Sequence, residues 1–173
     1  MKQNFTWKRA LLAVIFFLGL ILLDQWTKSL AVTYLMDQEP FAIFPGIFQL
    51  CYLENRGAAF GMMQGKQILF VIMAFVAFAF IIYAYFKLPW EKHFHLLRAS
   101  GVMIAGGAFG NLIDRIFRGY VVDFFYFELI DFPVFNVADI YVTVATALLA
   151  VLLLFYYKEE ELECLFPSKK ERK

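Results

Sequence analysis

The sequence predicts an all-α membrane protein with four transmembrane helices and two strand-like segments outside the lipid. Of its 173 residues, 62% are hydrophobic and 20% are aromatic, whereas a soluble domain is nearer half apolar. Four apolar segments also reach the roughly 20 residues that a helix needs to cross a bilayer. The strand-like segments lie between these helices and carry β-branched and aromatic residues.

The four predicted helices span about residues 7–30, 67–86, 96–117 and 138–157. The first begins after Lys8 and Arg9, as a cleavable signal peptide would. No small-residue cleavage site follows its apolar run, however, and the helical pattern continues as far as Lys28. We therefore interpret this segment as a retained membrane helix, and the whole chain, 1–173, as a single integral membrane domain.

The orientation follows from the distribution of lysine and arginine. With both termini in the cytoplasm, eleven of these residues lie inside and five lie outside, as the positive-inside rule requires. Segments 31–66 and 118–137 are then extracytoplasmic, and 158–173 is a solvated cytoplasmic tail. The net charge of +1 and the dispersed basic residues give no indication of nucleic-acid binding.

The two extracytoplasmic segments each contain a predicted strand, over residues 48–54 and 120–127. The first strand follows a Pro45-Gly46 turn signal. The two strands are expected to pair into a small sheet above the helix ends. The chain after Asn55 contains small residues, beginning at Gly57, and a short stretch that we expect to lie on the membrane surface. Small residues serve close helix packing, or alternatively a substrate cleft.

Topology excludes most hydrolytic chemistry from the outer face. Both histidines, His93 and His95, lie in the predicted cytoplasmic loop, so an outer site has none for a nucleophile–base pair or for zinc. Ser29 follows Lys28 directly, but adjacent residues of a helix point about 100° apart, which disfavours a Ser–Lys dyad. No metal or organic cofactor is expected.

Carboxylates beside hydrocarbon are costly and usually functional, and Asp123 and Asp139 are the candidates for a pair. Asp123 follows the third helix and Asp139 opens the fourth, so the loop between them can return to the same surface. Two such acids share a proton near neutral pH, which suits peptide hydrolysis by an activated water. Alternatively, Asn136 caps the fourth helix with Asp139 in its first turn, and Asp123 is a solvated loop residue.

Other polar residues near the outer helix ends have both structural and functional interpretations. Asp24 and Lys28 are four residues apart, which favours an internal ion pair over direct substrate contact. Asp114 is four residues before Arg118, and a salt bridge that anchors the helix end is its preferred interpretation. Asn55 and Asn111 are expected either to hydrogen-bond a substrate backbone or to satisfy the protein's own groups. Arg115 is expected either to tether a carboxylate or a lipid phosphate through two hydrogen bonds or to form a salt bridge that anchors the helix end.

Five motifs then stand in order along the chain: Asp24-Gln25-x-x-Lys28, Asn55-x-Gly57-Ala58-Ala59-Phe60-Gly61, Gly106-Gly107-Ala108-x-Gly110-Asn111-x-x-Asp114-Arg115, Val121-Val122-Asp123-Phe124 and Phe135-Asn136-x-Ala138-Asp139. In these motifs the sequence resembles the lipoprotein signal peptidases, the bacterial signal peptidase II family of membrane aspartyl endopeptidases. The resemblance covers most of the chain from Asp24 to Val144, and no motif position departs from the pattern.

The resemblance implies a fold of four transmembrane helices with a small extracytoplasmic β-sheet and a short surface helix. It implies a catalytic dyad of Asp123 and Asp139, with substrate binding or support from Asn55, Gly57, Asn111, Arg115, Asn136, Asp24, Lys28 and Asp114. The substrate would be a diacylglyceryl-modified prolipoprotein, cleaved before the lipidated cysteine. The protein would be a monomer in the bacterial inner membrane, in contact with its lipids, with the site at the outer face. A cyclic peptide inhibitor of the globomycin type would be a further partner.

Two other functions remain as alternatives. A proton- or ion-coupled carrier would use Asp24, Asp114, Asp123 and Asp139 as a relay. Such a relay needs ionisable groups at mid-depth, whereas these gather at the outer helix ends. A non-catalytic membrane subunit would tolerate replacement of both Asp123 and Asp139.

Overall fold

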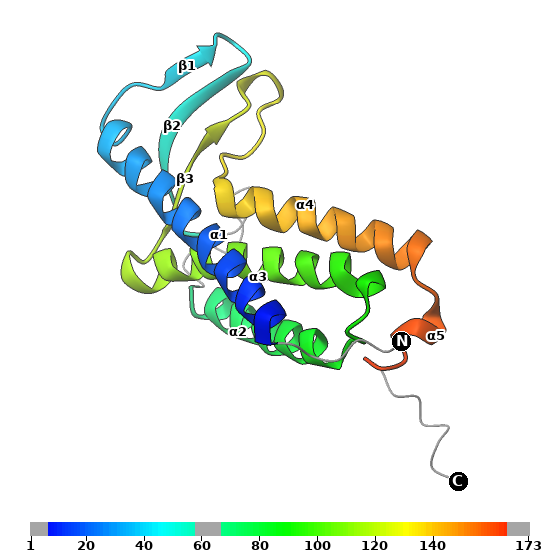
Figure 1. Cartoon of the computed structure of the whole chain (residues 1–173). Coiled ribbons are helices and arrows are strands. Elements are labelled where there is room, and N and C mark those ends of the chain that lie inside the picture. Colours follow the sequence, from blue (N-terminus) through cyan, green and yellow to red (C-terminus); the bar gives the residue numbers. More distant parts are fainter. Residues whose placement is uncertain (1–6, 58–66, 166–173) are drawn as a thin grey trace.

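Four long helices form the body of the molecule in the computed structural model, which describes residues 7–57 and 67–165 (Figure 1). They are α1 (Trp7–Tyr34), α2 (Gln67–Lys87), α3 (His95–Phe117) and α4 (Val137–Val151), which a π-helical turn continues over Leu152–Tyr156. Each has the length and apolar composition to cross a membrane when the turns continuous with α3 and α4 are included. The predicted fold class of four membrane helices with a small sheet is confirmed.

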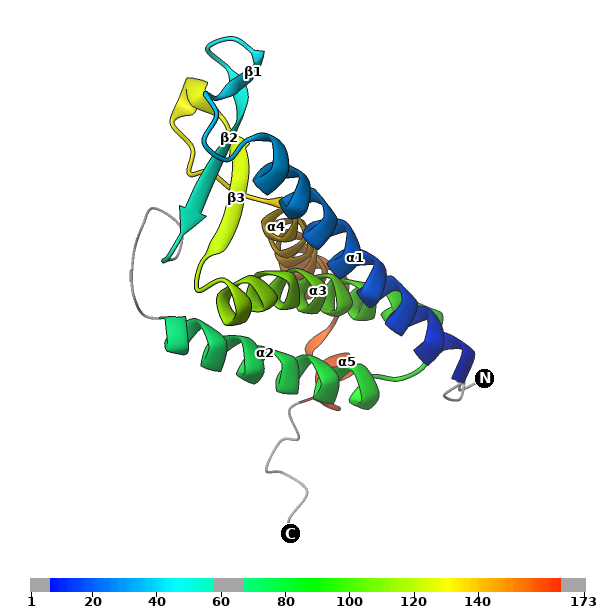
Figure 2. The ribbon, with the colours of Figure 1, turned by 90° about the vertical axis from the view of Figure 1, so that its left-hand side faces the viewer.

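Helix α3 lies at the centre, with α1, α2 and α4 packed around it (Figure 2). Glycines permit this close approach. A Cβ atom on Gly107 would lie 2.5 Å from the carbonyl oxygen of Ala138 in α4, and one on Gly110 would overlap the Asp24 carboxylate of α1. Gly107 and Gly110 of α3 therefore serve close helix packing, at the point where α1, α3 and α4 meet.

Three antiparallel strands form a sheet at one end of the helices, in the order β1 (Phe41–Phe44), β2 (Phe48–Asn55) and β3 (Val121–Tyr126). Gly46 has a φ of +72° in the turn between β1 and β2, which glycine adopts without strain. Strands β2 and β3 correspond to the two predicted strands. The prediction missed β1, because a four-residue edge strand with every side chain exposed carries no alternation of buried and exposed positions.

Ala31, Val122 and Phe124 form a buried cluster that seats the sheet on the end of α1. Val122 and Phe124 share one face of β3, so Asp123 points to the opposite face. The predicted surface helix after Asn55 falls on residues 58–66 and lies outside the described residues.

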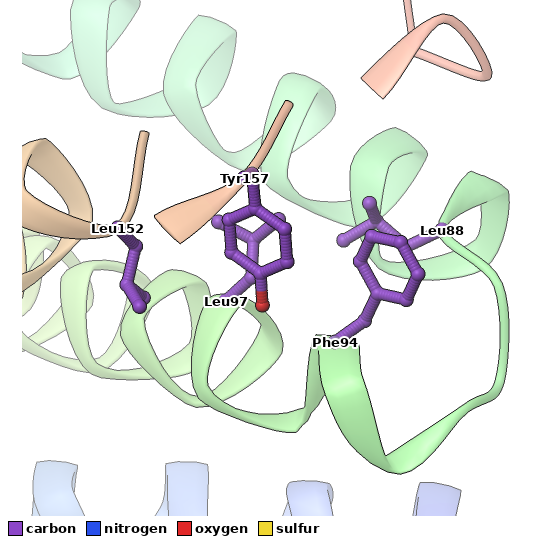
Figure 3. Close-up of a cluster of buried hydrophobic side chains, with 5 residues drawn as sticks. All are labelled: Leu88, Phe94, Leu97, Leu152 and Tyr157. Carbon is purple, nitrogen blue, oxygen red and sulfur yellow. The ribbon is translucent and has the colours of Figure 1, made fainter. Parts of the chain in front are cut away.

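A second apolar cluster joins the helices at the end remote from the sheet (Figure 3). It consists of Leu88, Phe94, Leu97, Leu152 and Tyr157. Leu162, Cys164 and Leu165 also pack against it, and Glu161 of the short helix α5 (Glu159–Leu162) forms an ion pair with His93 over 3.0 Å. The beginning of the predicted solvated tail is thus packed against the helix ends.

Candidate functional site

A cavity of about 450 Å³ lies where β3 and the first turns of α4 meet the end of α3. Asp123 and Asp139 both line it. The rest of its polar lining comes from Asn55, Asn111, Arg115 and Thr143. Much of the remaining wall is apolar and includes Phe132, Ile140, Val142 and Val144. The cavity is therefore an apolar cleft with a compact polar floor, the usual composition of a ligand site.

Asp123 is held by two side-chain amides. Asn136 donates to its Oδ1 over 2.6 Å, and Asn55 donates to its Oδ2 over 2.8 Å. The side chain is almost fully buried, at 1% exposure. Burial, and secondly the negative charge of Asp139, raise the pKa of Asp123 to about 7. Asp123 therefore titrates near neutral pH.

Asp139 occupies the first turn of α4 in a reciprocal cap with Asn136. Its backbone N–H donates to Asn136 Oδ1, and its Oδ2 accepts from the backbone N–H of Asn136, both over 3.1 Å. Its Oδ1 accepts from the side-chain amide of Asn111 over 2.9 Å. The structural interpretation of Asp139 as a helix-capping residue is correct, yet the same carboxylate also faces the cavity.

Asn136 connects the two acids, since its side chain donates to Asp123 while its backbone donates to Asp139. The amide of Asn136 also reaches Asn111 Oδ1 over 3.2 Å. The interpretation of Asp123 as a solvated loop residue is wrong, because this carboxyl is buried on a strand. Two carboxyls so placed can hold one proton between them and activate a water molecule.

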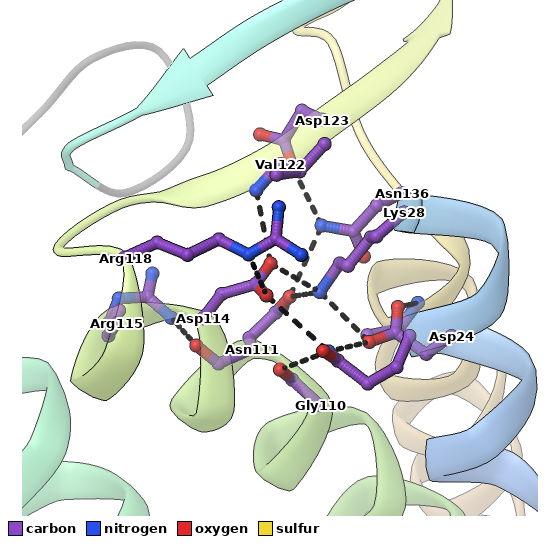
Figure 4. Close-up of polar contacts among 12 residues, drawn as sticks. Asp24, Lys28, Gly110, Asn111, Asp114, Arg115, Arg118, Val122, Asp123 and Asn136 are labelled. Carbon is purple, nitrogen blue, oxygen red and sulfur yellow. Dashed lines mark hydrogen bonds and ion pairs between the residues drawn. The ribbon is translucent and has the colours of Figure 1, made fainter. Parts of the chain in front are cut away.

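Behind the cavity, Lys28 is the centre of a buried polar network (Figure 4). Its Nζ lies 2.9 Å from Asp24 Oδ2 and 3.2 Å from Asp114 Oδ2, and it donates to Asn111 Oδ1 over 2.7 Å. The lysine and both aspartates have no exposed surface. The internal ion pair of Asp24 and Lys28 is as predicted. A buried charge is tolerated only when paired and hydrogen-bonded, so this network depends on all its members.

The network also positions the two elements that carry the cavity acids. Asp24 Oδ1 accepts from the backbone N–H of Ala138 over 3.0 Å, which ties α1 to the first turn of α4. Asp114 Oδ2 accepts from the backbone N–H of Val122 over 3.1 Å, which ties α3 to β3. Arg118 lies 3.5 Å from Asp114 Oδ1 as predicted, but Asp114 is more than a surface anchor for the helix end.

Gln25 was missed as a site residue, although it stands between Asp24 and Lys28 in the first motif. Its Nε2 donates to Asp24 Oδ2 and to the Gly110 carbonyl, both over 3.1 Å. The backbone N–H groups of Val122 and Ala138 were missed as well. Sequence carries no signal for them, because any residue except proline supplies an N–H.

Arg115 lies along the cavity wall and contacts Gly57, which follows the end of β2. Its Nη2 donates to the Gly57 carbonyl over 3.3 Å, and its guanidinium lies 4.8 Å from the centre of the Phe70 ring. Gly57 in turn donates its N–H to Asn55 Oδ1 over 2.9 Å. Arg115 thereby joins α3, the end of β2 and the start of α2.

All ten predicted site residues thus lie together. Six line the cavity, and the other four lie buried behind it: Asn136, Asp24, Lys28 and Asp114. The two histidines lie at the far end of the helices, in the turn before α3 and at its start. Over residues 7–57 and 67–165, no group of three or more His, Cys, Asp or Glu side chains is arranged to hold a metal ion.

Comparison with known proteins gives one consistent result. The family model described as signal peptidase (SPase) II matches residues 16–155. A lipoprotein signal peptidase of Caldanaerobacter subterraneus subsp. tengcongensis is 43% identical over 83% of this chain and 97% of its own length. That of Clostridioides difficile is 40% identical, over 84% and 97% respectively. Among solved structures, a bacterial membrane enzyme determined by the in meso method at 2.3 Å is 28% identical, with a TM-score of 0.74 over 92% of this chain and 97% of that one.

Proposed function

The chain belongs to the signal peptidase II family, and from this we propose that it cleaves diacylglyceryl-modified prolipoproteins before the lipidated cysteine, through a water activated by Asp123 and Asp139. Membership makes the protein a protease that removes signal peptides from lipoproteins, and a multi-pass protein of a bacterial membrane. The catalytic residues, the cleavage site and the orientation are our proposal.

The observation that carries the proposal is the pairing of Asp123 and Asp139 through Asn136 in one cavity. Among the described residues that line this cavity, Thr143 is the only one with a hydroxyl or thiol, and no histidine or lysine stands beside it to serve as a base. Carboxylates are therefore the groups best suited to hydrolyse a peptide there.

We propose that Asp123 holds the shared proton near neutral pH, in accord with its raised pKa of about 7. Asp139 takes a proton from the water, and the resulting hydroxide attacks the scissile carbonyl carbon while Asp123 donates its proton to the carbonyl oxygen. Asp139 then passes its proton to the leaving amine as the C–N bond breaks. As the intermediate, which carries two hydroxyl groups, becomes the new carboxyl group, one hydroxyl proton returns to Asp123. The enzyme is thereby regenerated.

The apolar wall of the cavity suits the lipid and signal-peptide parts of this substrate. Val142, Val144 and Ile140 belong to α4, a membrane-spanning helix, so acyl chains can contact them without leaving the hydrocarbon. Asn55, Gly57 and Arg115 lie where the substrate backbone would pass, and we assign them to its binding. A globomycin-type cyclic peptide would compete for the same cavity.

We further propose that both termini face the cytoplasm and that the cavity opens at the outer face of the inner membrane. The excess of lysine and arginine on the side of the termini supports this orientation. We propose that the chain acts as a monomer, because both acids and their supporting network come from one chain.

The substrate is tested with purified protein and two forms of one precursor, with and without diacylglycerol on its lipobox cysteine. Mass spectrometry of the products should show cleavage of the lipidated form alone, with the modified cysteine at the new amino terminus. Equal cleavage of both forms, or cleavage elsewhere, would refute the proposed specificity. Ion flux across proteoliposomes without any cleavage would support the carrier instead.

A further inference from the structure

A cationic cavity of about 250 Å³ lies at the end of the helices opposite Asp123 and Asp139. It lies between the start of α1, the connection from α2 to α3 and the start of α3, which the two views show far from the sheet (Figures 1 and 2). Arg9, His95 and Arg98 line it, together with Tyr85 and Trp90. None of these residues belongs to the proposed catalytic site.

Arg98 is a buried cation, at 7% exposure, held by neutral groups. It donates to the carbonyl oxygens of Leu88 and Tyr85 over 2.6 and 3.2 Å, and its guanidinium lies 4.2 Å from the centre of the Trp90 ring. Its Nη1 has no hydrogen-bond partner, and across residues 7–57 and 67–165 no carboxylate forms an ion pair with it. Because a buried charge is costly without a counter-charge, this end of the protein favours an anion.

An apolar cavity of about 310 Å³ adjoins the cationic one and shares Ala13, Tyr85 and Val102 with it. Residues of α1, α2 and α3 line both cavities, so the two lie next to each other between these helices. Towards the middle of the helices, Phe109 contacts Phe17 of α1 and Phe78 of α2 edge to face, each with ring centres 5.6 Å apart. This aromatic group marks the inner end of the apolar groove.

The length of the groove matches one membrane leaflet. Arg98 and Phe109 are eleven residues apart on α3, which is about 16 Å at the rise of an α-helix. Half the hydrocarbon thickness of a bilayer is about 15 Å. A cationic cavity at the membrane surface, continued by an apolar groove one leaflet deep, has the dimensions of a phospholipid headgroup with one acyl chain.

We propose that this composite cavity binds an anionic phospholipid of the leaflet at this end of the helices. The phosphate lies against the more accessible Arg9 and His95, and buried Arg98 contributes its positive charge from behind. One acyl chain occupies the groove between α1 and α2. A zwitterionic lipid is disfavoured because its own cationic group would face the guanidinium groups of Arg9 and Arg98. The proposal does not depend on the catalytic mechanism.

The test is a titration of the delipidated full-length protein with phosphatidylglycerol and with phosphatidylcholine of the same chains, followed by native mass spectrometry. Phosphatidylglycerol should bind more tightly. Arg9→Gln should weaken its binding by about fivefold, the effect of one basic residue at a membrane surface. Lys8→Gln, the same loss of charge at the exposed neighbouring residue, should have little effect. Equal binding of both lipids, or equal losses in the two variants, would overturn the proposal.

Two further arms separate a lipid site from a phosphate site. Ala13→Phe, which fills the groove, should weaken binding of long-chain phosphatidylglycerol, whereas Leu22→Phe at an exposed position of the same helix should not. Inorganic phosphate should compete poorly with the lipid. Displacement by phosphate alone, with no effect of Ala13→Phe, would show a simple anion site and contradict the acyl-chain assignment. Unchanged melting temperatures confirm that the variants fold.

Discussion

The side-chain amide of Asn136 donates to Asp123 Oδ1 over 2.6 Å, and this contact joins the cap of α4 to the strand that carries the buried acid. The same residue caps α4 through Asp139. Asn136 therefore sets the relative position of the two carboxyls, although it does not itself line the cavity. A single short side chain thus has a structural and a positioning role.

Replacement of Asn136 should separate these two roles. Asn136→Ala removes both, so we expect destabilisation by about 1–3 kcal/mol from the lost cap and the unpaired carboxyl, and loss of cleavage. Asn136→Ser retains a capping oxygen but is too short to reach Asp123. It should keep most of the stability and still lose most of the activity. Thermal unfolding and precursor cleavage measure the two effects, and full activity in Asn136→Ser would contradict the positioning role.

Lys28 should contribute mainly to stability, because it neutralises Asp24 and Asp114 in a site without solvent. Lys28→Met leaves both charges unpaired and is expected to cost about 3–5 kcal/mol. The double variant Lys28→Met/Asp24→Asn should recover part of this loss. Lys87→Met, the same substitution at an exposed helix end, should change stability by less than about 0.5 kcal/mol. Equal melting temperatures for Lys28→Met and Lys87→Met would contradict the buried network.

Substitution of Gly107 tests whether the close approach of α3 and α4 is required. Gly107→Ala places a methyl group against the Ala138 carbonyl, so α4 must move away from α3 and Asp139 with it. We expect a loss of stability of about 1–3 kcal/mol, together with reduced cleavage. Gly19→Ala, on α1 with no atom within 4 Å of the new methyl, should be neutral or stabilising. A stable and fully active Gly107→Ala protein would show that this close approach is not required.

The pH dependence of cleavage follows from Asp123. Because its pKa is raised to about 7, the proton required for catalysis is lost as the pH rises through 7. We expect kcat/KM to fall on the alkaline side with an apparent pKa near 7. An activity that is flat between pH 6 and 9 would contradict the assignment of the proton to Asp123.

Stability provides an independent check of the same pKa. A carboxyl with a raised pKa in the folded state destabilises the fold increasingly as the pH rises from its ordinary value of 3.8 to about 7, and by a constant amount above that. Asp123→Asn removes this cost, so the variant should gain in melting temperature relative to the unmodified protein at pH 8 and lose that gain towards pH 4. No difference between the two pH values would indicate an ordinary pKa.

The sequence was sufficient for the features that depend on local pattern. The four apolar segments are long enough to require membrane helices, and the four-residue spacing of Asp24 and Lys28 indicated their ion pair. The Asn136 cap was likewise readable from its position before an apolar helix. Local pattern alone left the function of Asp139 open, because a helix cap and a catalytic acid require the same residue at the same place.

What the sequence did not reveal depends on contacts between distant segments. The sequence predicts Arg118 as the partner of Asp114. In the structure, the buried contacts of Asp114 are with Lys28 of α1 and with the backbone of Val122. Asp123 lies in a predicted strand, but the strand pattern does not show whether its carboxyl is solvated or buried. The pairing of β3 with β2 places it at the cavity. Such links join different elements of the fold, so no periodicity within one element marks them.

The central claim is that Asp123 and Asp139 together hydrolyse the peptide bond, and the most direct test is the cleavage rate of Asp123→Asn and Asp139→Asn with a lipidated precursor. Each variant should lose activity by about 10²–10⁴-fold or more while it still folds and inserts. Asp131→Asn, at the exposed acid that accepts from the Tyr126 hydroxyl, is the matched control and should retain activity. Turnover at the unmodified rate in either Asp123→Asn or Asp139→Asn would contradict the account.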